Sequence, residues 1–156
     1  MLRLMLRGAI ALGGAAGAIA RYGCGLIAGG AAAGFPWGTL VVNVSGCWLL
    51  GFLLRVLPHP SAGLPRLNAG LTVGFCGGFT TFSTFAFEAL LLARAGQTGL
   101  ASIYVAITLI VGVLATSAGI GTGSLLEGRR TALARTVVRA RGSKASAPDA
   151  PPQDGA

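Results

Sequence analysis

The sequence predicts an all-α membrane protein with four transmembrane helices. The chain has 156 residues, of which 53% are hydrophobic and only 10% charged, and its mean hydropathy is +0.74. These values lie outside the range of soluble domains. Four apolar stretches are each long enough to cross a bilayer, and the 26 glycines suit closely packed membrane helices. We therefore expect a four-helix membrane domain over residues 1–126 and a separate tail over residues 127–156.

The first span is expected at about residues 9–28. Gly13 and Gly17 lie four residues apart, as in faces where two membrane helices pack closely. A cleavable signal peptide is the alternative, with a basic start, an apolar core and then Ala18-Ile19-Ala20. The glycine-rich stretch continues past Ala20, which favours a span. Arg21 within it is either a functional intramembrane cation or a side chain that reaches back to the interface.

The second span is expected at about residues 37–57. Trp37 follows a proline, which is typical of a helix start anchored at the membrane interface. Asn43 lies six residues further along, roughly 9 Å deep at the helical rise. Its amide can donate to an anion or bond a neighbouring helix, and the spacing leaves both interpretations open.

The third span, at about residues 67–92, carries the sequence GFCGGFTTFSTF over residues 74–85. Its glycines permit unwinding, its hydroxyls can donate hydrogen bonds, and its phenylalanine rings have positive edges. We expect the helix to unwind at Gly77 and Gly78, near the membrane midplane. Broken membrane helices are tolerated where they are buried or line a wet cavity, and they often build ion sites. The alternative is a glycine packing seam with phenylalanines facing lipid.

Polar residues continue into the end of this span and into the fourth, at about residues 100–125. Glu88 near the end of the third span is either functional or simply exposed at the interface. In the fourth span, a residue that is small or carries a hydroxyl recurs every four positions, at Tyr104, Thr108, Gly112 and Thr116. These residues share one helical face. This face is either a polar track or a packing surface whose hydroxyls bond their own backbone.

The positive charge is concentrated in the tail. Six of the 12 basic residues lie at positions 129–144, so the apolar part is only mildly basic. We expect the basic part to lie on anionic lipid headgroups rather than nucleic acid, and the Pro/Ala-rich end to be disordered. Four spans place both termini on one side, with ten basic residues, against Arg94 alone on the other. The positive-inside rule then predicts cytoplasmic termini.

The sequence offers no enzyme chemistry. It has no pair of carboxylates, no cysteine paired with a histidine in a catalytic pattern, and no phosphate-binding loop of the GxxxxGK[ST] type. Its cysteines, Cys24, Cys47 and Cys76, are far apart in apolar segments, which is typical of small buried side chains. His59 lies in a proline-flanked loop. We predict that the protein is not an enzyme.

Taken together, these residues resemble the Fluc (CrcB-type) fluoride channels. The resemblance covers about residues 8–125 and rests on GTLVVNVSG at 38–46, on GFCGGFTTFSTF at 74–85 and on Arg21-Tyr22. It implies an antiparallel, dual-topology dimer with two fluoride pathways along its interface and one central structural sodium ion (Na+). The implied function is passive fluoride efflux across the bacterial plasma membrane, which lowers toxic cytoplasmic fluoride.

The resemblance also implies roles for single residues. Phe82 and Phe85 would turn their ring edges toward fluoride, and Asn43 would line the pore as a donor. The backbone carbonyls of Gly77 and Thr80 would hold the sodium ion. The remaining implied pathway residues are Arg21 in an aqueous vestibule and a polar track of Ser83, Thr84, Glu88, Tyr104 and Thr108.

Two features depart from the family pattern. Gly112 stands where a further hydroxyl is expected on the fourth span. The charge bias of ten to one is large for a chain that must insert both ways, so the partner is either a second copy or an oppositely oriented relative. The alternative functions are a small proton-coupled exporter that uses Glu88, and a membrane packing subunit that transports nothing.

Overall fold

The structure is a computed structural model that describes residues 2–27, 34–57 and 65–145. All of its regular secondary structure over these ranges is helical, and four helical stretches are long and apolar enough to cross a membrane. These stretches are Arg3–Ile27, Trp37–Val56, Pro65–Arg94 and Thr98–Arg129. The prediction of an all-α membrane protein with four spans is therefore confirmed. His59 and the Pro/Ala-rich end of the tail lie outside the described residues.

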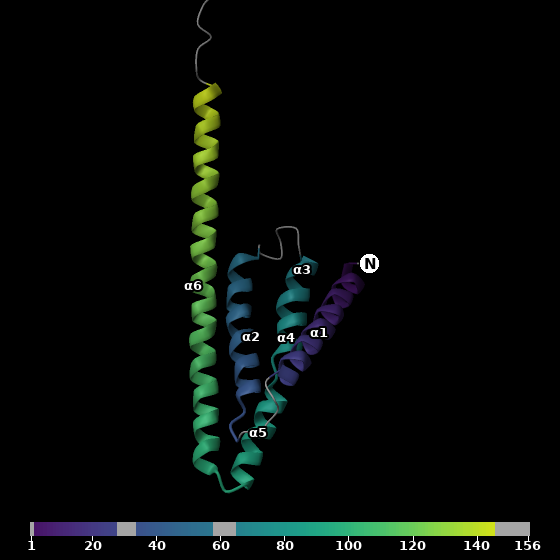
Figure 1. Cartoon of the computed structure of the whole chain (residues 1–156). Helices are drawn as coiled ribbons and strands as arrows, with labels where there is room; N and C mark the ends of the chain where they lie inside the picture. Colours follow the sequence, from purple (N-terminus) through teal and green to yellow (C-terminus); the bar gives the residue numbers. More distant parts are fainter. Residues whose placement is uncertain (1, 28–33, 58–64, 146–156) are drawn as a thin grey trace, which may run out of the picture.

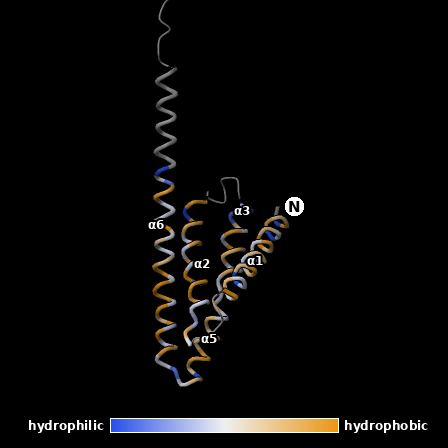
Figure 2. Tube along the Cα trace, in the orientation of Figure 1, coloured by the Kyte–Doolittle hydropathy of each residue, from blue (hydrophilic) through white to orange (hydrophobic). Residues whose placement is uncertain are grey.

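The first, second and fourth spans are single helices. They are α1 (Leu2–Ile27), α2 (Trp37–Val56) and α6 (Thr98–Ala145), and α2 runs beside α6 (Figure 1). The start of α1 and the far half of α6 lie at the same end of the bundle, as an even number of spans requires. Apolar residues dominate the helices within the bundle (Figure 2).

The third span is built from four consecutive pieces. They are α3 (Pro65–Ala69), the π-helical segment η3 (Gly70–Cys76), α4 (Gly77–Phe79) and α5 (Phe82–Arg94). Between α4 and α5, Thr80 and Thr81 have extended backbones, with φ/ψ of −74°/158° and −145°/122°. Gly77 and Gly78, where the sequence predicted unwinding, are themselves helical.

Glycine contacts bring α1 against the third span. A Cβ atom at Gly13 would collide with the carbonyl oxygen of Gly70, and one at Gly17 would collide with that of Phe75. Gly78 lies equally close to the backbone of α1, so its small size serves packing rather than unwinding. The predicted close-packing face of Gly13 and Gly17 is thus confirmed, and α1 is an integral part of the bundle.

The contact between α2 and α6 also depends on glycine. A Cβ atom at Gly51 of α2 would collide with the carbonyl of Thr116, and one at Gly119 of α6 would collide with that of Trp48. Contacts this close fix the register of the two helices, because no larger side chain fits between the backbones.

Helix α6 does not end at the expected boundary near residue 126 but continues to Ala145. Its backbone extends beyond the rest of the bundle (Figure 1). Where α6 leaves the bundle, the Arg55 side chain of α2 forms an ion pair with Glu127 at 2.9 Å and donates to Ser124 Oγ at 3.0 Å. The basic part of the expected tail is therefore a helical continuation of the fourth span.

Candidate ion pathway

Asn43 on α2 binds the extended part of the third span. Its Nδ2 donates to the carbonyl of Thr81 at 3.0 Å, and its Oδ1 accepts from the Thr81 backbone N–H at 2.8 Å. In a continuous α-helix that N–H would bond the carbonyl of Gly77, four residues back. Asn43 therefore replaces the partner that the Thr81 N–H loses where the helix is interrupted, and it adds a bond to the Thr81 carbonyl. One Nδ2 hydrogen suffices for the Thr81 bond, which leaves a second for another acceptor.

Thr81 also begins α5. Its Oγ1 accepts from the backbone N–H of Thr84 at 3.2 Å, which is an N-cap, and it donates to Thr84 Oγ1 at 3.0 Å. Ser83 Oγ lies 3.3 Å from Thr81 Oγ1. The predicted residues Ser83 and Thr84 thus gather with Thr81 at the positive end of a helix.

The two predicted phenylalanines lie one helical turn apart at the start of α5. The centroids of the Phe82 and Phe85 rings are 5.8 Å apart and the rings are tilted by 51°. Phe85 is buried and packs on Tyr104, whereas Phe82 is 78% exposed in the single chain. Phe82 therefore finds no packing partner that covers it within one chain.

Glu88 is held between two helices by neutral hydroxyls. Its carboxylate accepts from Thr39 Oγ1 of α2 and from Tyr104 Oη of α6, each at 2.9 Å. Tyr104 is completely buried. Glu88 thus has specific partners from two neighbouring spans and is not simply a charge exposed at the interface.

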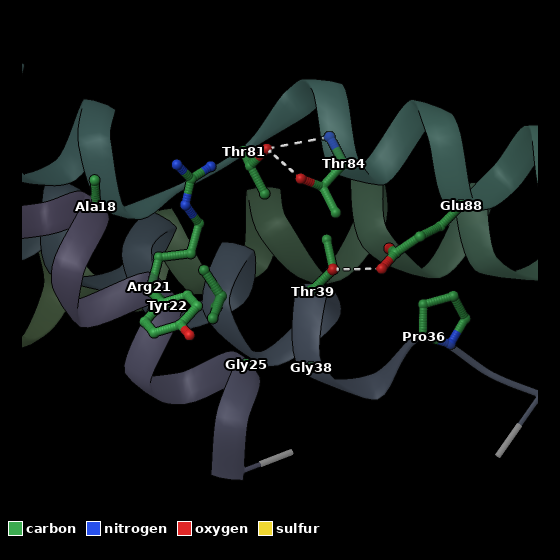
Figure 3. A pocket seen from close by; sticks show the side chains of 11 residues that line it. Ala18, Arg21, Tyr22, Gly25, Pro36, Gly38, Thr39, Thr81, Thr84 and Glu88 are labelled. Carbon is green, nitrogen blue, oxygen red and sulfur yellow. Dashed lines mark hydrogen bonds between the residues drawn. The ribbon is translucent and has the colours of Figure 1, made fainter. Parts of the chain in front are cut away.

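A cavity of about 360 Å³ joins several of these polar groups. Arg21 and Tyr22 line it from α1, Thr39 from α2, and Thr84 and Glu88 from α5 (Figure 3). Arg21 faces the cavity with a half-buried side chain. The cavity therefore combines the positive charge of Arg21 with the Glu88 carboxylate and with hydroxyl groups.

A second, more open groove of about 550 Å³ lies on another side of the Thr80–Thr81 segment. Asn43 contributes to its wall, as do Phe82 and Phe85. It also includes the predicted sodium positions and part of the polar face of α6, namely Gly77, Thr80, Thr108, Gly112 and Thr116. Most of the predicted residues thus line one of these two spaces, and Thr81 lines both, whereas Ser83 and Tyr104 line neither.

The hydroxyls of α6 bond their own helix. Thr108 Oγ1 donates to the Tyr104 carbonyl at 2.7 Å, and Thr116 Oγ1 donates to the Gly112 carbonyl at 3.0 Å. This is the arrangement that simple packing predicts. In this conformation these hydroxyls present lone pairs rather than hydrogens to the groove.

Two polar residues of this region were not singled out from the sequence. Thr81 was one of several hydroxyls in a run, although a threonine directly before an apolar helical stretch is an N-cap signal. Thr39 lies four residues before Asn43 and therefore on the same face of α2. That spacing could have identified it.

The backbone at the predicted sodium positions offers oxygen atoms. Since Asn43 takes the N–H of Thr81, the carbonyl of Gly77 loses the bond that a continuous helix would give it. Thr80 has an extended backbone and lines the same groove. Carbonyl oxygens are suitable ligands for hard cations, so these two residues fit the sodium expectation.

Comparison with known proteins gives a consistent result. The family model described as "CrcB-like protein, Camphor Resistance (CrcB)" matches residues 8–120. The chain is similar to a "Fluoride-specific ion channel FluC" of Thermus thermophilus, with 44% identity over 121 residues, which are 76% of this chain and 95% of that protein. It is 42% identical to the protein of the same name from Acidobacterium capsulatum over 116 residues, 74% of this chain and 93% of that one.

A similar protein from Geobacillus kaustophilus bears the name "Fluoride-specific ion channel FluC 2". It is 41% identical over 112 residues, which are 71% of this chain and 87% of that relative. The match of the family model covers most of the membrane part of the chain, and the relatives are covered almost completely. The chain therefore belongs to the family of CrcB-like proteins.

Proposed function

We propose that this protein is a fluoride channel that lets fluoride leave the bacterial cytoplasm passively. The main support is the arrangement of one groove. Asn43 bonds the extended Thr80–Thr81 segment there, and Phe82 and Phe85 line the same groove. Relatives at 42–44% identity carry the name of a fluoride-specific channel. Membership of a family of ion channels agrees with the prediction that the chain is not an enzyme.

The groove suits an anion that must lose its water. Neutral donors and ring edges can replace a hydration shell without binding the ion so tightly that it stays. The second N–H of Asn43 and the positive edges of Phe82 and Phe85 supply such groups. We place fluoride beside these three side chains, with Thr108 able to rotate its hydroxyl toward it.

The 360 Å³ cavity is the proposed entrance. Arg21 attracts anions there, and the Thr84 hydroxyl offers a hydrogen bond at the N-terminus of α5, where Ser83 lies beside Thr81. Glu88 accepts from Thr39 and Tyr104 and so holds both donors in a defined geometry. Fluoride that approaches Tyr104 would compete with the carboxylate for its hydroxyl.

A second chain completes the groove in this proposal. Phe82 is 78% exposed and the groove is open along one side, so a partner subunit would cover both. An antiparallel arrangement brings the same groove from both chains to one interface. The partner is a second copy or, given the bias of ten basic residues against one, an oppositely oriented relative.

We also propose a structural sodium ion at this interface. The carbonyls of Gly77 and Thr80 from both chains would hold it. When bound, the ion supplies a fixed positive charge that neutral donors lack. It is not transported in this proposal.

Fluoride efflux from liposomes that contain the purified protein tests the function. A fluoride electrode follows release at neutral pH after a potassium ionophore is added, and a chloride electrode follows chloride in matched vesicles. We expect rapid fluoride release that continues when a protonophore removes any proton gradient. Absence of fluoride release, or release that requires the proton gradient, would overturn the proposal.

A further inference from the structure

The polar face of α6 is interrupted at one position. Tyr104, Thr108 and Thr116 each carry a hydroxyl at intervals of four or eight residues, whereas Gly112 between them carries none. A Cβ atom built at Gly112 would lie 3.6 Å from the Sγ atom of Cys47 on α2. The thiol of a neighbouring helix therefore faces the place where the hydroxyl is missing.

Cys47 belongs to the same groove as the proposed fluoride ligands. It lies one helical turn after Asn43 on α2, and both residues line the 550 Å³ groove with Gly112. The side chain of Cys47 is only partly buried in the single chain. The close backbone contact at Gly51 fixes how α2 sits on α6, so the thiol keeps its place opposite Gly112.

The hydroxyl groups and the thiol that line this groove differ in whether their hydrogens are already bonded to the protein. Thr108 and Thr116 direct their hydroxyl hydrogens to carbonyls of their own helix. Within the described residues, no hydrogen bond involves the thiol of Cys47, although a thiol is a neutral, weak donor. Its S–H is therefore available to a ligand in the groove without first breaking a bond to the protein.

We propose that Cys47 is a pathway residue that supplies, at the level of Gly112, the neutral donor that the fourth span lacks. The inference rests on the proposed fluoride channel and deepens it. An anion that passes Asn43 meets the Cys47 S–H one turn further along α2. A thiol binds fluoride more weakly than a hydroxyl, so the ion is not trapped there.

Simple packing is the competing explanation, because cysteine often behaves as a small apolar residue. Serine and alanine separate the two cases. Both are close to cysteine in size, but only serine can donate a hydrogen bond. A packing role predicts that both replacements have similar effects, whereas a donor role predicts that alanine is clearly more harmful than serine.

The experiment measures fluoride efflux from liposomes for the wild type, Cys47→Ala, Cys47→Ser and the double variant Cys47→Ala/Gly112→Ser. Cys24→Ala is the matched control, since Cys24 lies on α1 and does not line the groove. We expect a roughly fivefold loss for Cys47→Ala, from one weak hydrogen bond. Cys47→Ser should lose clearly less than Cys47→Ala, and Cys24→Ala should remain close to the wild type.

The double variant should recover part of the lost flux, because a serine hydroxyl on α6 can also bond its own helix, as those of Thr108 and Thr116 do. Removing the sulfur leaves room at Gly112 for a serine, whose hydroxyl then stands on α6 itself. Equal losses for Cys47→Ala and Cys47→Ser, or no loss for either, would overturn the role of Cys47 while the channel function stands. A wild type without fluoride flux would overturn both the channel function and this inference.

Discussion

Asn43 meets both backbone polar groups of Thr81, the N–H at 2.8 Å and the carbonyl at 3.0 Å. One side chain of α2 thus holds the third span where its helix is interrupted. Buried backbone groups without partners are costly in a membrane. The pairing therefore gives Asn43 a structural role beside its proposed part in conduction.

Asn43→Asp should abolish most fluoride efflux. An aspartate can still accept from the Thr81 N–H, but it cannot donate to the Thr81 carbonyl and places a negative charge in an anion groove. We expect a loss of about a hundredfold in liposome efflux. Ser45→Ala is the control, because Ser45 on α2 bonds only its own backbone. Near-normal efflux in Asn43→Asp would remove Asn43 from the pathway.

Phe82→Ile should abolish fluoride efflux with little effect on the fold of the chain. Isoleucine keeps the apolar character but has no ring edge for an anion. Phe87→Ile is a matched control, since Phe87 is 60% exposed on the same helix and does not line the groove. If both substitutions change efflux equally, the ring of Phe82 has no special role.

Gly17→Ala should destabilise the bundle. The added Cβ would meet the carbonyl of Phe75 and lie 2.7 Å from the backbone nitrogen of Phe79. We expect a loss of about 1–3 kcal/mol in the free energy of unfolding, since backbones must move apart. Thermal unfolding in detergent measures it. Gly23→Ala should be silent because nothing lies within 4 Å of that position. Similar melting of both variants would contradict this contact.

Glu88→Ala should cost more stability than the double variant Glu88→Ala/Tyr104→Phe. The single change leaves the completely buried Tyr104 hydroxyl without its acceptor, at a cost of about 1–3 kcal/mol. Removing both groups avoids that cost. Thermal unfolding of both single variants and the double variant gives the coupling energy. Simple additivity would show that the hydrogen bond contributes nothing.

The sequence predicted where the four spans lie, but not where the third span is interrupted. Hydropathy alone places four helices, because each must be long and apolar to cross a bilayer. Hydropathy does not show where an interrupted helix opens. The sequence favoured Gly77, whereas the extended residues are Thr80 and Thr81, since a partner on another helix captures the Thr81 backbone.

The sequence proposes candidate residues for the site but not their geometry. Spacing along one helix identifies a shared face, as for Tyr104 and Thr108. It cannot show that Thr39 reaches Glu88 across 49 residues, or that Phe82 stays exposed while Phe85 is buried. These relations depend on how separate spans pack.

The unbroken course of α6 has a practical consequence. One helix both forms a wall of the groove and projects well clear of the bundle, and Arg55 secures it where it emerges. A rigid protein fused in helical register to its projecting part would share the orientation of the whole bundle. In electron cryomicroscopy, the fused protein would then allow particles of this small membrane protein to be aligned.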